Sequence, residues 1–314
     1  MSMACAYAID AYAEDASALP AVLEAALDEV DRIDRLMSHY KPDSPLSRVN
    51  REAAAHPVAV EAELFDFIAE ALRYGRESDG AFDVTVGPLM KAWGFFCGGG
   101  RVPGPEEIDE LRGRLGYRHV VLDAREKTIR FDRPGVELDL GGIAKGYAVD
   151  RVVALLREAH VAAALVSAGG STLFALGAPP GREAWDVAVQ DPIDPGRVAF
   201  TVGLKDRALS VAGTSEKSFE QDGVTYSHIM DPRTGRPVQG MSSVAVLAAT
   251  GTAGDALDDA FFVQGVERSR AYLARLPGTE ALFFLPAGQG WKMVRERGPR
   301  TRPAHLAAGR STTP

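Results

Sequence analysis

The chain has 314 residues, of which 46% are hydrophobic and 25% are charged, so it can bury a large core and is not a disordered protein. Its formal net charge of −8 argues against a nucleic acid or an anionic membrane as the main partner, because those surfaces attract clustered positive charge. No run of about 18 apolar residues is present, so no membrane insertion is expected.

The N-terminal segment shows no basic residues followed by an apolar run, so no secretory signal is readable there. We therefore expect a cytoplasmic protein. The two cysteines, Cys5 and Cys97, are too few for a disulfide framework, and the six histidines show no pair at the spacing of helical metal ligands.

Two amphipathic helices are expected in the first quarter of the chain. Apolar residues recur at the spacing of one helix face over residues 21–37, directly after Pro20, where a helix can begin. A second set of apolar residues recurs at helical spacing over residues 61–74. The polar segment between them, MSHYKPDSPLSRVN (37–50), is expected to be a loop.

The middle of the chain is expected to place strands around one helix. Residues 80–95 begin like a strand, and the Gly- and Pro-rich segment 97–107 is typical of a surface turn. A helix is predicted over residues 143–159. Strands are predicted on both sides of it, over residues 120–123, 128–131, 137–140 and 163–168.

The last part of the chain continues with short strands. Residues 242–250 and 281–285 are predicted strands, and AGDALDDAFFVQG (253–265) opens a long helix. Because strands and helices do not alternate strictly, we expect an α+β (mixed α/β) fold with two intimately joined lobes. One domain is expected over residues 1–294, and residues 295–314, which lack periodicity, are expected to form a disordered tail.

The stretch ELDLGGIAKGYAVD (137–150) runs through Gly141 and Gly142 into the predicted helix. A helix N-terminus with Lys145 on its first turn would attract an anion such as a phosphate. The glycines match neither the dinucleotide fingerprint nor a P-loop. They could instead serve only tight packing of strand against helix, with Lys145 in solvent.

The stretch GDALDDAFF (254–262) places Asp255 and Asp259 four residues apart on one helix face, where like charges repel by about 0.2–0.5 kcal/mol. A divalent cation such as Mg²⁺ would convert that repulsion into ligation. Alternatively, the acids only stabilise the start of the helix, with Thr252 and Asp255 as a capping pair.

Other segments hold residues suited to binding or catalysis. In VTYSHIMDPRTGRPV (224–238), His228 could take or give a proton near neutral pH. Tyr40 offers an aromatic surface for a flat ring, and Phe82 and Asp83 lie beside a glycine. Each also has a structural interpretation, as a surface histidine, a turn or an ordinary strand entry.

In this order and spacing, the motifs resemble those of the ApbE family of FAD:protein FMN transferases over residues 3–284. The resemblance implies an ApbE/T-fold-like architecture. It also implies an enzyme that binds FAD and Mg²⁺ and cleaves the pyrophosphate. The FMN half is then attached to a threonine or serine hydroxyl of a target flavoprotein, and AMP is released.

The resemblance further implies roles for single residues. Contacts with FAD are expected from Met3, Tyr40, Ala81, Phe82, Asp83, Gly141, Lys145 and Ile229. The Mg²⁺ site is expected to combine the backbone carbonyl of Ala144 with the side chains of Asp255 and Asp259. His228 matches the histidine expected to deprotonate the acceptor hydroxyl.

Some positions depart from the family pattern. Asp259 replaces a threonine, Ser171 replaces the aspartate of a GGD segment, and AGTS (212–215) replaces SGDY. A second carboxylate at position 259 is expected to bind Mg²⁺ more tightly or to change the metal preference. Two other functions stay open, an FAD pyrophosphatase that uses water as acceptor and a non-catalytic FAD-binding protein.

Overall fold

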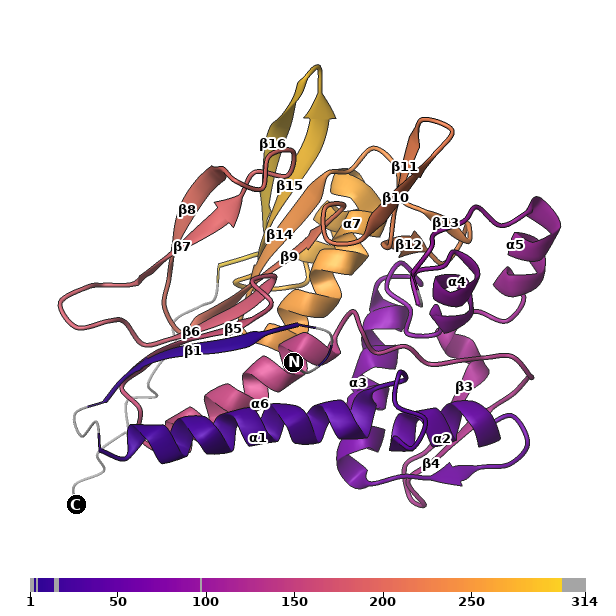
Figure 1. Cartoon of the computed structure of the whole chain (residues 1–314), viewed down its shortest axis with the longest axis horizontal. Helices are drawn as coiled ribbons and strands as arrows, with labels where there is room; N and C mark the ends of the chain where they lie inside the picture. Colours follow the sequence, from indigo (N-terminus) through magenta and orange to yellow (C-terminus); the bar gives the residue numbers. More distant parts are fainter. Residues whose placement is uncertain (1–2, 4, 14–16, 97, 301–314) are drawn as a thin grey trace, which may run out of the picture.

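The computed structural model describes residues 3, 5–13, 17–96 and 98–300 (Figure 1). At its centre lies a seven-stranded sheet in which all neighbouring strands are antiparallel. In sheet order the strands are β1 (Tyr7–Tyr12), β5 (Ala163–Ala168), β6 (Thr172–Leu176), β9 (Arg207–Gly213), β14 (Ser243–Ala248), β15 (Glu280–Ala287) and β16 (Gly290–Arg297).

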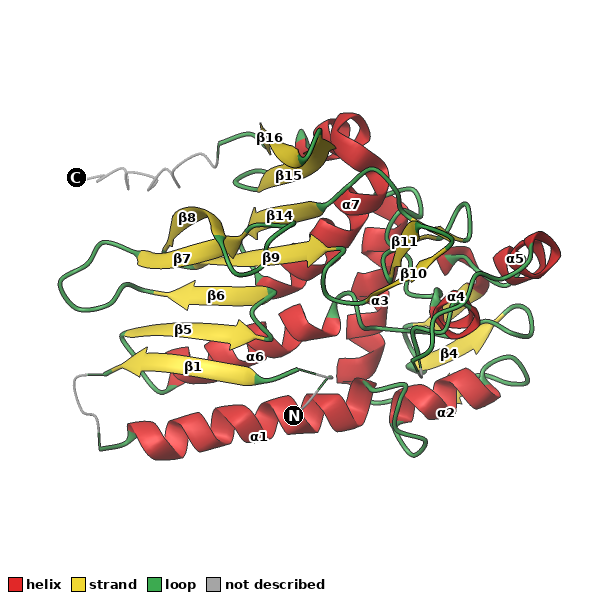
Figure 2. Ribbon diagram, turned by 45° about the horizontal axis from the view of Figure 1, so that its top comes forward, coloured by secondary structure: helices red, strands yellow, loops and turns green. Residues whose placement is uncertain are grey.

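Both faces of this sheet are covered. The helices α1 (Leu19–Met37), α6 (Ala144–Glu158) and α7 (Gly251–Leu273) lie along one face, as Figure 2 shows. The hairpin of β7 (Trp185–Gln190) and β8 (Val198–Leu204) packs its apolar residues against the other face. Every residue of β6 and β14 is therefore buried, as expected for strands that are covered on both sides.

A second, smaller lobe lies at the right of Figure 1 and is mostly helical. Its elements are α2 (Pro45–Glu52), β2 (Val58–Ala59), α3 (Ala62–Glu77), α4 (Gly87–Ala92), α5 (Pro105–Arg112), a 3₁₀ turn (Tyr117–His119), β3 (Val120–Asp123) and β4 (Thr128–Phe131). The three strands pair in the order β2-β4-β3. Two short ladders stand between the lobes, β10 (Ser218–Gln221) with β11 (Val224–Ser227), and β12 (Met230–Asp231) with β13 (Arg236–Pro237).

One hydrophobic core crosses from one lobe to the other. It joins Ile68 of α3 and Phe131 of β4 to Phe261 of α7 and Phe283 of β15. All four side chains are almost fully buried. The mixed α/β fold with two intimately joined lobes is therefore confirmed, and the shared core fixes how the lobes face each other.

The predicted helices at 21–37, 61–74 and 143–159 correspond to α1, α3 and α6. The predicted loop at 37–50 is partly wrong, because α2 begins at Pro45. Ser44 caps this helix, and its Oγ accepts the backbone N–H of Ser47 at 3.0 Å.

Three further sequence predictions are wrong. Residues 80–95 form turns and then α4 rather than a strand, and α5 begins at Pro105, inside the predicted surface turn. Residues 137–140 form no strand. Instead the side chain of Asn50 takes the place of a neighbouring strand, because it donates to the carbonyl of Leu138 (2.9 Å) and accepts the N–H of Leu138 (2.8 Å).

At the C-terminal end, β16 pairs with β15 and runs to Arg297, so the boundary expected after residue 294 falls inside a strand. Residues 301–314 of the predicted tail lie outside the described residues. None of the described helices combines the length and apolar character needed to span a bilayer.

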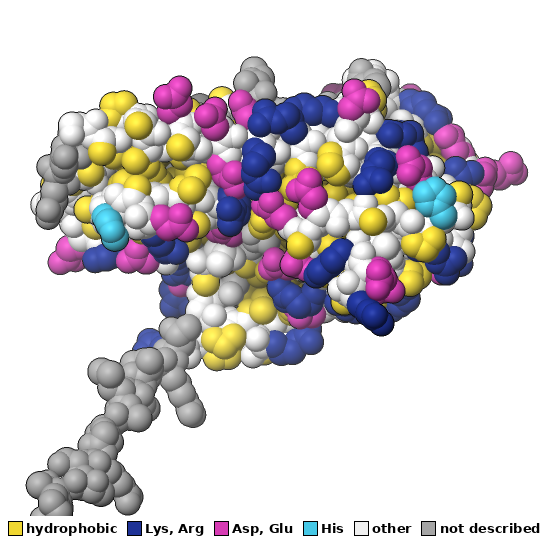
Figure 3. Space-filling model, turned by 90° about the horizontal axis from the view of Figure 1, so that it is seen from below, with side chains coloured by type: hydrophobic (Ala, Val, Ile, Leu, Met, Phe, Trp, Pro, Cys, Tyr) yellow, Lys and Arg dark blue, Asp and Glu magenta, His cyan; other side chains and the backbone are white. Residues whose placement is uncertain are grey.

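Figure 3 shows one face of the molecule, on which acidic and basic side chains are interspersed. This face offers no continuous basic surface of the kind that attracts a nucleic acid.

Candidate active site

A cleft of about 410 Å³ is lined by residues from both lobes. Except for Ala144, it brings together all the site residues expected from the sequence: Met3, Tyr40, Ala81, Phe82, Asp83, Gly141, Lys145, His228, Ile229, Asp255 and Asp259. For Ala144 only the backbone carbonyl is expected to take part, and its side chain is buried. Residues that are more than 200 positions apart thus meet in one place.

The floor of the cleft is the point where α6 and α7 touch. The backbone N–H of Gly146 donates to Oδ2 of Asp255 at 2.9 Å. A Cβ on Gly146 would collide with the backbone of Gly251, and a Cβ on Gly142 would collide with the carboxylate of Asp259. The glycines therefore serve close packing and, through that packing, bring the α7 carboxylates to the first turn of α6.

Asp255 is a buried residue with partners on two elements. Besides the bond from Gly146, its Oδ1 accepts the hydroxyl of Thr172 on β6 at 3.0 Å. The N-cap of α7 is Thr250, whose hydroxyl accepts the N–H of Ala253 at 3.1 Å. A capping pair of Thr252 and Asp255 is therefore wrong, and the carboxylate of Asp255 is directed to the cleft floor.

Three carboxylates of α7 line the cleft, those of Asp255, Asp258 and Asp259. Burial raises the pKa of each, and mutual repulsion adds to it for the last two. For Asp259, burial and the charge of Asp255 raise the pKa to about 7. Among the described residues, no group of three or more His, Cys, Asp and Glu side chains is arranged to hold a metal ion.

Lys145 is the basic residue that faces these acids. Its Nζ donates to Oγ of Ser171 at 2.8 Å, so the side chain does not simply extend into solvent. Burial alone would lower the pKa of Lys145, but the carboxylates of Asp255 and Glu216 outweigh it and raise that pKa. Lys145 therefore keeps its charge throughout the neutral range.

His228 lies between β11 and β12, opposite the turn that precedes β10. Because Ser218 pairs with Ser227, the next residues outward, Lys217 and His228, face each other. The carbonyl of Lys217 accepts the backbone N–H of His228 at 3.0 Å and lies 3.3 Å from its Nδ1. Burial is the main cause that lowers the pKa of His228 below its ordinary value of 6.5, so the ring is neutral at pH 7.

Tyr40 belongs to a small aromatic cluster at one end of the cleft. Its ring stacks on Phe96 with a centroid distance of 4.6 Å and lies 4.0 Å from the ring of His39. Nδ1 of His39 lies 3.3 Å from Oδ1 of Asp139, which also accepts the N–H of Gly141 at 2.9 Å. The aromatic cluster is thus tied to the glycine turn.

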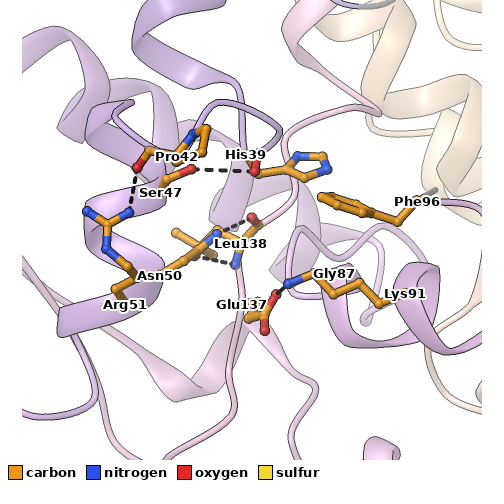
Figure 4. Close-up of a pocket in the computed structure, with 10 residues that line it drawn as sticks. All are labelled: His39, Pro42, Ser47, Asn50, Arg51, Gly87, Lys91, Phe96, Glu137 and Leu138. Atoms are coloured by element: carbon orange, nitrogen blue, oxygen red, sulfur yellow. Dashed lines mark hydrogen bonds and ion pairs between the residues drawn. The ribbon is translucent and has the colours of Figure 1, made fainter.

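His39 and Phe96 also line a smaller pocket of about 210 Å³, shown in Figure 4. There the ion pair of Lys91 with Glu137 and the bonds between Asn50 and Leu138 hold α2 and α4 against the segment before the glycine turn. These contacts hold residues 137 and 138 in place, directly before Asp139 and Gly141, which line the cleft.

Two residues expected to contact FAD already have partners within the protein. The carboxylate of Asp83 accepts the N–H and hydroxyl of Thr85 (2.9 and 2.7 Å) and the N–H of Tyr117 (2.8 Å). The backbone N–H of Met3 donates to Asp34 at 3.1 Å. Asp83 therefore holds the shape of the loop after α3, while its neighbours Ala81 and Phe82 line the cleft.

Sequence reasoning missed several residues of the cleft: His39, Asp139, Glu216, Lys217 and Asp258. Three of them lie within the stretches 37–50, 137–150 and 254–262, in which the sequence already indicates site residues. Asp258 directly precedes Asp259, and His39 precedes Tyr40. Glu216 had no signal of its own, because only the pairing of β10 with β11 brings it beside His228.

Comparison with known proteins agrees with this geometry. The chain matches the ApbE family over residues 3–283. The FAD:protein FMN transferase of Treponema pallidum is 36% identical over 285 residues, which cover 85% of this chain and 78% of that protein. The protein of the same name from Escherichia coli is 33% identical over 284 residues, which cover 88% and 80%.

Solved structures are similar over nearly the whole chain. The ApbE protein of Thermotoga maritima has a TM-score of 0.86 and 32% identity, covering 94% of this chain and 95% of that one. The flavinyl transferase ApbE of Pseudomonas stutzeri has a TM-score of 0.82 and 31% identity, covering 92% and 90%. Since the family match, the relatives and the fold all agree, the chain belongs to the ApbE family.

Proposed function

We propose that this chain is an FAD:protein FMN transferase. It cleaves the pyrophosphate of FAD, joins the FMN half to a threonine or serine hydroxyl of a target flavoprotein, and releases AMP. The observation that carries this proposal is the meeting of the glycine turn, the α7 carboxylates and His228 in one cleft. The names of the similar proteins support the same reaction.

Mg²⁺ is proposed to bind between Asp255, Asp259 and the carbonyl of Ala144. The side chains present suit such an ion, because carboxylate oxygens are the ligands that Mg²⁺ prefers. Burial and the charge of Asp255 raise the pKa of Asp259, a divalent cation would relieve that repulsion, and Gly142 leaves room for the carboxylate. Held by these residues, Mg²⁺ would supply positive charge that stabilises the diphosphate during its cleavage.

The diphosphate of FAD is proposed to lie at the start of α6. The positive end of the helix dipole and the ammonium of Lys145 both favour an anion there. Tyr40, Met3, Phe82 and Ile229 would then contact the flat rings of FAD with largely apolar surface.

His228 is proposed as the general base. Because the ring is neutral at pH 7, it can take the proton of a hydroxyl that is too weakly acidic to attack a phosphorus atom unaided. Phosphoryl transfer asks little else of a protein than positioning and charge stabilisation. A cytoplasmic location for the reaction stays a prediction, which fractionation of cells would test.

The test uses the full chain, FAD, Mg²⁺ and a purified flavoprotein domain with a candidate acceptor threonine. We expect an acceptor mass increase equal to FMN and one AMP for each flavin attached. His228→Asn should bind FAD with nearly unchanged affinity and transfer none. Fast release of AMP and FMN without any acceptor would favour the pyrophosphatase, and FAD binding without any turnover would favour a binding protein.

A further inference from the structure

The two ring nitrogens of His228 have different surroundings. Nδ1 lies 3.3 Å from the carbonyl of Lys217. A carbonyl can only accept a hydrogen bond, so Nδ1 carries the proton of the neutral ring. The free lone pair is therefore on Nε2, and Nε2 is the atom that can take a proton from a substrate.

Nε2 faces Glu216, whose Oε2 lies 3.9 Å away. While the ring is neutral, both atoms are acceptors and form no hydrogen bond. Once Nε2 holds a proton, the imidazolium and the carboxylate become an ion pair. Their attraction thus grows as the proton is transferred, which is the condition for an interaction to raise a rate rather than only to tighten binding.

The other groups around His228 disfavour its charged form. Burial is the largest effect, and the ammonium groups of Lys145 and Lys217 act in the same direction. Glu216 opposes them, together with the carbonyl of Lys217. Without Glu216, the imidazolium would therefore form beside two positive charges in a partly buried site.

We propose that Glu216 is the proton-accepting partner of His228, which stabilises the imidazolium during flavin transfer and then passes its proton to solvent. Glu216 acts through His228 and is a positioning residue. Its side chain is 41% exposed, whereas that of His228 is 24% exposed, so the carboxylate offers a route to water. This inference rests on the proposed function.

The proposed step is balanced in atoms and charge. The hydroxyl oxygen of the acceptor forms a bond to the phosphorus of the FMN half. The bond from that phosphorus to the bridging oxygen breaks, and AMP leaves with the electron pair. The hydroxyl proton moves to Nε2 of His228, then to Glu216 and to water, and the neutral ring is restored.

The test compares wild type with Glu216→Gln at saturating FAD and Mg²⁺ over a range of pH. We expect the transfer rate at neutral pH to fall about tenfold, since a positioned proton acceptor is lost. The acid limb of the pH–rate profile should move about one unit lower, because an opposite charge near an imidazolium is removed. FAD affinity, measured by fluorescence, should change little by comparison.

A second readout does not need turnover. The imidazole resonance of His228, assigned with His228→Asn, should titrate about one pH unit lower in Glu216→Gln than in wild type. Glu216→Asp keeps the charge and should lie closer to wild type in both measurements. Glu220→Gln is the matched control, because Glu220 is an exposed acid on the same hairpin and should leave rate and titration unchanged.

An unchanged rate together with an unshifted His228 titration in Glu216→Gln would overturn the inference. If wild type transfers no flavin to any acceptor, the proposed function fails separately. The titration then decides alone: an unshifted resonance overturns the pairing, and a lowered one supports it.

Discussion

Asp255 accepts the backbone N–H of Gly146 at 2.9 Å, and this bond joins α7 to the first turn of α6. The helices can touch there because both positions are glycine. A Cβ on Gly146 or on Gly251 would collide with the backbone of the other helix. The acid proposed as a metal ligand is therefore fixed by a helix crossing. The glycine motif and the acidic motif, separate in sequence, form one structural unit.

Gly146→Ala should separate the two helices. The new Cβ would lie 2.8 Å from the Cβ of Asp255 and would collide with the backbone of Gly251, which cannot move away easily. We expect a loss of about 1–3 kcal/mol in the free energy of unfolding, as for other overpacked sites. Urea unfolding monitored by circular dichroism measures it. Gly290→Ala, where the nearest atom to a Cβ is the carbonyl oxygen of Ala287 at 3.9 Å, should change stability little, and equal effects of both changes would contradict this account.

Asn50→Ala should disturb the segment before the glycine turn. It leaves the N–H and C=O of Leu138 without their side-chain partner, and we expect a cost of about 1–3 kcal/mol. Asn50→Asp keeps the acceptor but loses the donor, so it should fall between Ala and wild type. The same unfolding experiment, combined with FAD titration, checks both variants. Because Asp139 and Gly141 follow directly, FAD affinity should decrease together with stability.

Local patterns predict helices and short motifs well for a physical reason. The regular apolar spacing of α1 and the Gly141–Gly142 pair before α6 each carry their signal within a few residues. By contrast, Asn50 replaces a strand partner for Leu138, which is 88 positions away in sequence. No local pattern encodes such a bond, so the sequence of residues 137–140 predicts a strand that the structure does not contain.

The same distinction applies to the cleft. The expected site residues came from motifs and from the family resemblance, and all but Ala144 line the cleft. Glu216 and Lys217 became visible only through the register of β10 against β11, which places them beside His228. The interior of α7 is similar: Gly265 interrupts its helical backbone with φ 71°, a break that the apolar spacing does not reveal.

Lys145→Met tests the cation that faces the α7 acids. Lys145 lowers the pKa of Asp255 and Asp259, so its loss should raise both pKa values and leave the repulsion between the two carboxylates without an opposing positive charge. We expect FAD affinity to fall at least about tenfold, because a charge that attracts the diphosphate is lost. Mg²⁺ affinity, measured by calorimetry, should stay equal or rise. Lys145→Arg keeps the charge and serves as the control, and a parallel loss of Mg²⁺ affinity in Lys145→Met would contradict this assignment of roles.

Asp259 should make the metal-free protein sensitive to pH. Its pKa is raised from 3.8 to about 7 in the folded chain, so the folded state binds more protons than the unfolded state between these values. The contribution of this group to stability is therefore present below pH 3.8 and is lost as the pH rises through about 7. In EDTA, the melting temperature should fall between pH 5 and 8, and Mg²⁺ should restore it most at the higher pH, where the carboxylates are ionised. Asp259→Asn should flatten the pH dependence and weaken Mg²⁺ binding, whereas a pH profile identical to wild type would contradict the burial and repulsion described here.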